Sequence, residues 1–276
     1  MRLKFLGTAA AEGVPALFCN CETCSYARRH KGKDLRKRSQ ALLDGKILID
    51  FPADTYANTL KYNIDLSKVR HLLITHKHLD HIYSDEFEMI VDGFTNLPKG
   101  YEPLKVYCAN DVYPLISKIQ EKAPQNIEIK VMEPFKPFLI DDYKITALKA
   151  IHGSKDMNPY IYLIEKDKKG LLYALDTDVF PKESWDYLEK TKPQIGLVVF
   201  DCTNGTDEEM PYIGHMCFGK NRICKERLLK MGLINEKTKL YVTHFSHNWP
   251  ILHKDLTKKG RKDGFVPSYD GLTVKF

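Results

Sequence analysis

The chain has 276 residues, of which 43% are hydrophobic, and its formal net charge is +6. The seven cysteines lack the regular spacing of a small secreted disulfide protein. The opening residues contain no apolar run of signal-peptide length, and no stretch approaches the roughly 20 apolar residues of a membrane span. The sequence therefore predicts a reduced, cytoplasmic protein without a membrane segment.

The first half of the chain predicts short strands with helices between them. Strands are expected at 2–6, at 72–75, and twice within 39–50 around the hairpin signal Asp44-Gly45. Helical character is found at 84–92 and at 111–122. A loop of small residues, 7–13, follows the first strand.

The second half repeats these types of element. Strands are expected at 144–151, 160–165, 170–175, 196–201, 239–243 and 269–276. Helices are expected at 182–190 and 221–231. Strand groups interrupted by helices in both halves are typical of a layered α/β protein. Because the motifs described below span the chain, we expect residues 1–276 to form a single domain.

The segment after the strand at 72–75 carries the strongest chemical signal. It reads Thr75-His76-Lys77-His78-Leu79-Asp80-His81 and holds four candidate metal ligands within six residues. Imidazoles and carboxylates suit zinc, manganese or iron. A regular helix or strand cannot direct all four to one ion, whereas a loop can direct them to two neighbouring ions. Three further candidates follow later apolar strands: His152, Asp176 and His244.

The pattern His76-x-His78-x-Asp80-His81, with the three later residues, resembles the metal signature of the metallo-β-lactamase superfamily. The resemblance extends from Leu6-Gly7-Thr8 to Asp270-Gly271 and implies an αββα sandwich of the α/β class. It implies one ion held by His76, His78 and His152, and a second held by Asp80, His81 and His244. Asp176 would bridge the two ions with its two carboxylate oxygens. Asp178 is the rival for that role, but Asp176 stands first after its strand, as in the family.

A second motif, Cys19-Asn20-Cys21-Glu22-Thr23-Cys24, places three thiols within six residues. In a reduced compartment this spacing favours metal binding over a redox role or simple packing of small apolar residues. A structural zinc takes four ligands. The residues alone leave the fourth open among His30, Cys202, Cys217, His247 and His253.

This cysteine motif, the opening segment Leu6 to Pro15 and Arg28-Arg29 together resemble the PhnP-like phosphodiesterases, which act on a cyclic ribosyl phosphate. The late segment Thr243-His244-Phe245-Ser246-His247 matches as well. The resemblance implies that His247 completes a structural zinc site with Cys19, Cys21 and Cys24. It also implies a homodimer. Residues 82–135 match poorly, and Lys77 departs from the residue usual between the first two histidines.

The segment Gly214-His215-Met216-Cys217 resembles a loop of that family whose histidine is proposed as general acid. Histidine suits this role because its unperturbed pKa is near neutrality. The alternative is a surface histidine without a role in the chemistry.

We therefore expect a binuclear metal-dependent phosphodiesterase that hydrolyses a small cyclic phosphate or another phosphodiester. A metal-bridging hydroxide would attack phosphorus, and the expected catalytic residues are His215, Asp80 and Asp176. The expected cofactors are two catalytic divalent ions, zinc or manganese, and one structural zinc. Alternatives on the same fold are PqqB-like cofactor biosynthesis, lactone or thioester hydrolysis, and RNA processing. A non-enzymatic scaffold is disfavoured because all seven ligand positions are filled.

The densest basic run is Lys31 to Arg38, and it has two interpretations. The preferred one is a solvated loop, and the other is attraction of an anionic substrate such as a phosphate. Because the run is short and has no interleaved aromatic residues, we do not expect the protein to bind nucleic acid.

Overall fold

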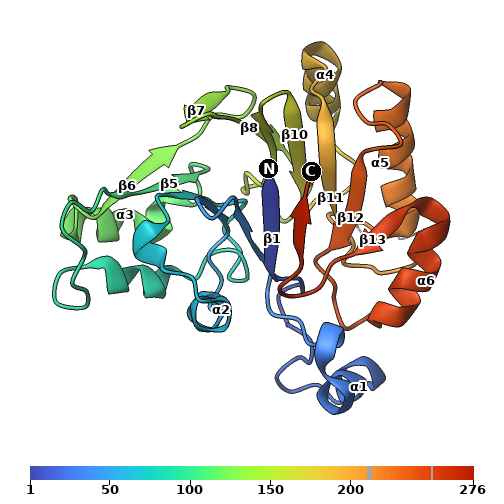
Figure 1. The fold of residues 1–276 in the computed structure, drawn as a ribbon, viewed down its shortest axis with the longest axis horizontal. Helices are drawn as coiled ribbons and strands as arrows, with labels where there is room; N and C mark the ends of the chain where they lie inside the picture. Colours follow the sequence, from blue (N-terminus) through green and yellow to red (C-terminus); the bar gives the residue numbers. More distant parts are fainter. Residues whose placement is uncertain (210–212, 250) are drawn as a thin grey trace.

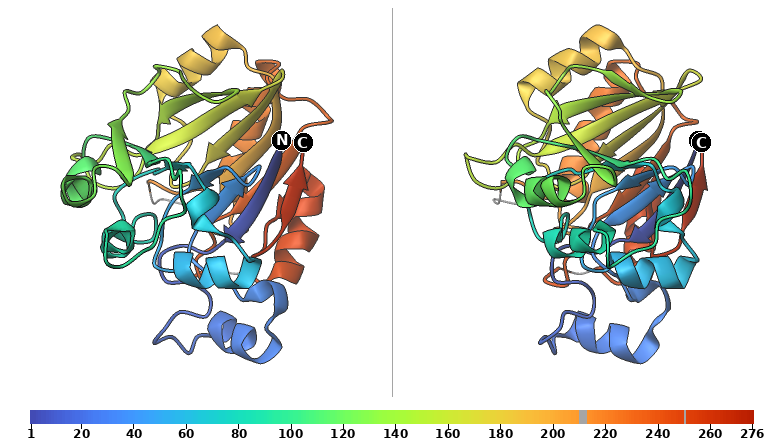
Figure 2. Two further views of the ribbon diagram at one scale, coloured as in Figure 1. Left: turned by 60° about the vertical axis from the view of Figure 1, so that its left-hand side comes forward. Right: turned by 90° about the vertical axis from the view of Figure 1, so that its left-hand side faces the viewer.

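The structure is a computed structural model that describes residues 1–209, 213–249 and 251–276. Within these residues two seven-stranded sheets face each other, with helices on their outer sides (Figure 1). In the views of Figure 2, α4 (Lys182–Thr191) lies beyond the second sheet and α2 (Thr55–Tyr62) beyond the first. The αββα sandwich expected from the sequence is confirmed.

The first sheet has the strand order β14-β1-β2-β3-β4-β5-β6. Its strands are β1 (Arg2–Gly7), β2 (Gln40–Leu43), β3 (Ile47–Ile49), β4 (His71–Leu73), β5 (Leu104–Cys108), β6 (Ile127–Val131) and β14 (Thr273–Lys275). The β2–β3 hairpin turns at Asp44 and Gly45, whose φ angles of 50° and 74° suit such a turn. From β3 to β6 the strands are parallel, so their carboxyl ends meet at one edge.

The second sheet has the order β13-β12-β11-β10-β9-β8-β7. Its strands are β7 (Phe138–Ile140), β8 (Tyr143–Lys149), β9 (Tyr160–Lys166), β10 (Lys169–Ala174), β11 (Ile195–Asp201), β12 (Lys239–Thr243) and β13 (Phe265–Pro267). Strands β10 to β13 are parallel. The loops that follow β10, β11 and β12 therefore leave the sheet at a common edge.

Helices expected at 111–122, 182–190 and 221–231 are present as α3 (Tyr113–Lys122), α4 and α5 (Phe218–Lys230). The segment expected as a helix at 84–92 forms instead the 3₁₀ helix η3 (Ser84–Ile90), in which only Phe87 is buried and no apolar stripe supports an α-helix. The helices α1 (Glu22–His30), α2 and α6 (His253–Asp263) were not predicted. None of the helices in the described ranges is long and apolar enough to cross a membrane.

The core between the sheets is apolar, with tyrosine hydroxyls that join one sheet to the other. Tyr162 on β9 donates to the carbonyl of Ile74 at 2.5 Å, and Tyr143 on β8 donates to Asp44 at 2.7 Å. The backbone N–H of Tyr160 also donates to the carbonyl of Thr75 at 2.9 Å. These contacts hold the end of β4 against the second sheet, so loops from both sheets meet at one edge.

The basic run does not form a solvated loop throughout. Its first residues, 31–33, are exposed, but Arg36 is only 3% exposed. The Arg36 guanidinium donates to Thr8 Oγ1 at 3.0 Å and to the Ser268 carbonyl at 2.8 Å, and it lies 4.4 Å from the Phe245 ring. The solvated-loop interpretation is therefore wrong for Arg36, which joins the start of the chain to its end.

Arg36 also makes the stability of the protein dependent on pH through His253. The guanidinium lies 3.4 Å from His253 Nδ1, and the pKa of His253 falls to about 4 because the ring is partly buried and because Arg36 and Lys33 are near. The unfolded chain binds a proton at His253 below pH ~6.5, whereas the folded chain binds it only below pH ~4. The free energy of unfolding therefore falls as pH decreases through this window. The loss of unfolding free energy between pH 7 and pH 5 should be smaller for His253→Gln than for wild type, by about 1–2 kcal/mol. Thermal melts at the two pH values measure this difference. Equal losses in the two proteins would contradict this account.

Candidate metal centre

Polar residues gather where the parallel strands of both sheets end. Asp50 follows β3, Asp176 follows β10 and His244 follows β12. These three residues have φ angles of 66°, 48° and 65°, a left-handed conformation that is uncommon outside glycine. Such strain concentrates at functional sites, where the surrounding structure holds it. The folded structure therefore holds all three residues in an uncommon backbone conformation, as expected for a functional site.

Three histidines form a first cluster at this edge. His78 Nδ1 lies 3.0 Å from His76 Nε2 and 3.0 Å from His152 Nε2. Two nitrogens bound to one zinc at ~2.0–2.1 Å would lie about 3.0–3.4 Å apart, so the observed spacing fits a shared ion. Burial lowers the pKa of all three rings, which favours the neutral form that binds metals.

A second cluster lies beside the first and contains a carboxylate. His81 Nε2 is 3.3 Å from His244 Nε2 and 3.2 Å from Asp80 Oδ2. Burial opposes the charged form of both rings, but the carboxylates of Asp80 and Asp176 outweigh burial and raise the pKa of His81 and His244. The site therefore favours positive charge, which a metal cation would supply.

Asp176 lies between the two clusters. Its Oδ2 is 2.8 Å from His81 Nε2 and 3.0 Å from His244 Nε2, while its Oδ1 is 3.5 Å from His152 Nε2. Oδ2 is buried and makes no hydrogen bond within the described ranges, which is costly unless a cation is present. The rival Asp178 is engaged elsewhere, because it accepts from Lys220 Nζ at 2.6 Å and from the Gly214 N–H at 3.2 Å.

The second ring nitrogen of His76, His81, His152 and His244 is also fixed. These contacts orient the rings and select their tautomers, as outer contacts commonly do at metal sites. They are His76 Nδ1 to Thr75 Oγ1 at 3.0 Å, His81 Nδ1 to Asp50 Oδ2 at 2.7 Å, His152 Nδ1 to Gly214 O at 3.0 Å and His244 Nδ1 to Thr203 Oγ1 at 2.8 Å. Sequence reasoning missed Asp50 and Thr203. Asp50 ends an apolar strand, which is the same signal that identified Asp176.

His215 lies at the open side of the centre. Its side chain is 28% exposed, and its Nδ1 is 3.2 Å from Asp201 Oδ2 and 3.6 Å from Asp176 Oδ1. Burial lowers the pKa of the ring, but the carboxylates of Asp201, Asp176 and Asp80 outweigh it and raise the pKa to about 9. The ring therefore favours the protonated form beside the ligand clusters.

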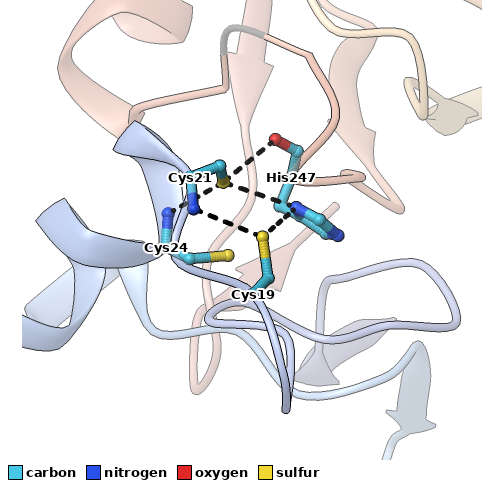
Figure 3. A group of neighbouring side chains, drawn as sticks. All are labelled: Cys19, Cys21, Cys24 and His247. Atoms are coloured by element: carbon cyan, nitrogen blue, oxygen red, sulfur yellow. Dashed lines mark hydrogen bonds between the residues drawn. The ribbon is translucent and has the colours of Figure 1, made fainter.

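The three cysteines converge with His247 at a separate site (Figure 3). His247 Nδ1 is 3.5 Å from Cys19 Sγ and 3.5 Å from Cys21 Sγ. A tetrahedral zinc with Zn–S near 2.3 Å and Zn–N near 2.0 Å would place sulfur and nitrogen about 3.5 Å apart. Among the fourth-ligand candidates, His247 is the one that the fold brings to the cysteines, and His253 lies instead against Arg36.

Two facing sheets with outer helices, and clusters of histidine and aspartate at one sheet edge, define a metal-binding hydrolase of the metallo-β-lactamase fold. The chain belongs to the family described as the β-lactamase superfamily domain, whose model matches residues 46–245. The matched region contains both histidine clusters and Asp176.

Solved structures share this fold across nearly the whole chain. A diphosphatase from the PhnP family is 22% identical with a TM-score of 0.73, covering 100% of this chain and 97% of that one. Zn²⁺-bound PqqB from Methylobacterium extorquens is 16% identical with a TM-score of 0.77, covering 100% of both chains. The short form of human tRNase Z is 15% identical with a TM-score of 0.66, covering 100% of this chain and 99% of that one. A search of curated protein sequences found no relative.

Proposed function

We propose that the protein is a phosphodiesterase that hydrolyses a small cyclic phosphate or another small phosphodiester. The observation that carries the proposal is the position of His215, whose ring lies 3.6 Å from the carboxylate between the two ligand clusters. A diphosphatase of the PhnP family shares the fold. With cations bound, the site would be electropositive and would also contain a proton donor, His215. Such a site suits an anionic substrate with an alkoxide leaving group.

In this proposal His76, His78 and His152 hold one divalent ion, and Asp80, His81 and His244 hold a second. Asp176 offers one oxygen to each. Zinc and manganese both suit these ligands. When bound, the two ions supply Lewis-acid activation of water and neutralise charge that develops on the phosphoryl group.

The side chains of this protein orient the substrate and move the proton. The partly exposed residues at the centre are His78, His152 and the proton donor His215, whereas the remaining proposed ligands are buried. The substrate would therefore approach from the side of these three histidines. His215 then protonates the departing oxygen. Asp80 and Asp176, which lie against His81, would supply the negative charge that binds the two cations.

We also propose that Cys19, Cys21, Cys24 and His247 bind a structural zinc. The chain offers four ligands of the types that close a structural site, and two of the sulfurs lie at the expected distance from the ring nitrogen. This zinc would fix the loop before α1 to the loop after β12, next to His244.

The experiment loads purified protein with Zn²⁺ or Mn²⁺ and measures hydrolysis of bis(4-nitrophenyl) phosphate, 2′,3′-cyclic AMP, a lactone and a thioester. We expect turnover of the phosphodiesters that EDTA abolishes and added metal restores. His215→Ala should lower turnover of the cyclic substrate about 10²-fold with unchanged metal content, because proton transfer contributes effects of this size. The control is His30→Ala, since His30 is an exposed histidine on α1. Folded, metal-loaded protein that cleaves only the lactone or the thioester would contradict the proposal.

A further inference from the structure

Asp201 is a buried carboxylate at the end of β11 that the sequence motifs did not single out. Asp201 is 0% exposed. On the neighbouring parallel strand β12 it pairs with Thr243, the residue before His244. The loop that carries Asp176 follows the strand on the other side, β10. Asp201 therefore lies between two of the loops that form the metal centre.

The Asp201 carboxylate accepts hydrogen bonds from donors on three loops. Its Oδ1 accepts from the backbone N–H of Met216 at 2.8 Å and from that of Thr203 at 3.0 Å. Its Oδ2 accepts from the Thr203 hydroxyl at 3.0 Å and from the Asp176 N–H at 3.2 Å. These donors occupy most of the lone pairs, so the carboxylate is oriented by hydrogen bonds and does not require a metal ion.

The same oxygen faces the ring of His215. Oδ2 lies 3.2 Å from His215 Nδ1, within reach of a hydrogen bond that the ring N–H donates. The Thr203 hydroxyl, which donates to Asp201, lies 2.8 Å from His244 Nδ1 and accepts from it. One carboxylate thus selects the Nδ1-protonated form of both rings, which leaves Nε2 of each ring outside these hydrogen bonds.

We propose that Asp201 is a positioning residue that holds His215 in the tautomer and orientation needed to protonate the leaving group. This inference rests on the proposed phosphodiesterase function. Attack by water forms one P–O bond and releases a proton to solvent, while the P–O bond to the leaving alkoxide breaks with its electron pair. His215 gives the Nε2 proton to that alkoxide and regains a proton from solvent. Asp201 takes no part in the proton transfer and touches no reacting atom.

The test compares leaving groups in metal-loaded wild type and Asp201→Asn. The leaving group of bis(4-nitrophenyl) phosphate departs without protonation, whereas that of 2′,3′-cyclic AMP is an alkoxide that needs a proton. We expect Asp201→Asn to lose about 10²-fold or more on the cyclic substrate and less than about tenfold on the nitrophenyl ester. A double variant with His215→Ala should be no slower than His215→Ala alone, because both changes remove the same proton transfer. Equal losses on both substrates, at unchanged metal content, would overturn the positioning role.

A measurement on wild type guards against a variant that does not fold. Nitrogen NMR of ¹⁵N-histidine protein, with the His215 signal assigned from its loss in His215→Gln, reports which ring nitrogen carries a proton. We expect Nδ1 of His215 to be protonated, and an unprotonated Nδ1 overturns the inference. If wild type cleaves neither phosphodiester, the proposed function fails, while the protonation state of Nδ1 still decides whether Asp201 positions the ring.

Discussion

Asp176→Asn is expected to lose bound metal from both clusters and to lower phosphodiester turnover by about 10³-fold or more. One carboxylate oxygen faces His81 and His244, and the other faces His152. An amide keeps the shape but carries no charge and only one acceptor oxygen, so one ion would lose a ligand and both would lose the negative charge between them. A loss of several kcal/mol of transition-state stabilisation corresponds to a factor of this size. Metal analysis and steady-state kinetics on the same preparations measure both effects.

Asp178→Asn is the matched control, because it makes the same chemical change two residues away. Asp178 pairs with Lys220 and the Gly214 N–H and lies outside the clusters, so this variant should keep its full metal content. It should still lose some activity, since Gly214 precedes His215. Full metal content in Asp176→Asn, or loss of metal in Asp178→Asn, would show that the bridging position is wrongly assigned.

Cys21→Ala is expected to remove one zinc per chain and to lower the midpoint of thermal unfolding by about 10 °C. A structural zinc contributes directly to the folding free energy, and a protein of this size shifts by about 2–4 °C per kcal/mol. The zinc would join the loop at Cys21 to His247, which is 226 residues away along the chain. Metal analysis combined with thermal melts measures the loss.

The control for that variant is Cys108→Ala, which removes a buried thiol from the core between the sheets. It should keep its zinc and lose only a few degrees, because the change removes one small group from a packed site. If Cys21→Ala keeps its zinc or unfolds at the wild-type temperature, the cysteine site is not a structural zinc site.

The candidate metal ligands were recognisable from the sequence because the signal is local. His76, His78, Asp80 and His81 lie within six residues, and Asp176 and His244 follow apolar strands. Most strands and the helices α3, α4 and α5 were predicted for the same reason, since their apolar pattern lies in neighbouring residues, but the strands β5, β6, β7 and β13 were not predicted. The charged sequence of α6 buries only Leu256 and Gly260, so it gave no such pattern.

The sequence by itself determined the residue types, their spacing and the layered α/β class. Only the tertiary structure decided contacts that no motif located: Asp178 with Lys220, Arg36 in the core, and Asp201 between His215 and the loop of Asp176. These contacts join residues far apart in the chain, or depend on which side of a loop a carboxylate faces. Such contacts are fixed by the order of the parallel strands and by the packing of one sheet on the other, which no local pattern of residues encodes.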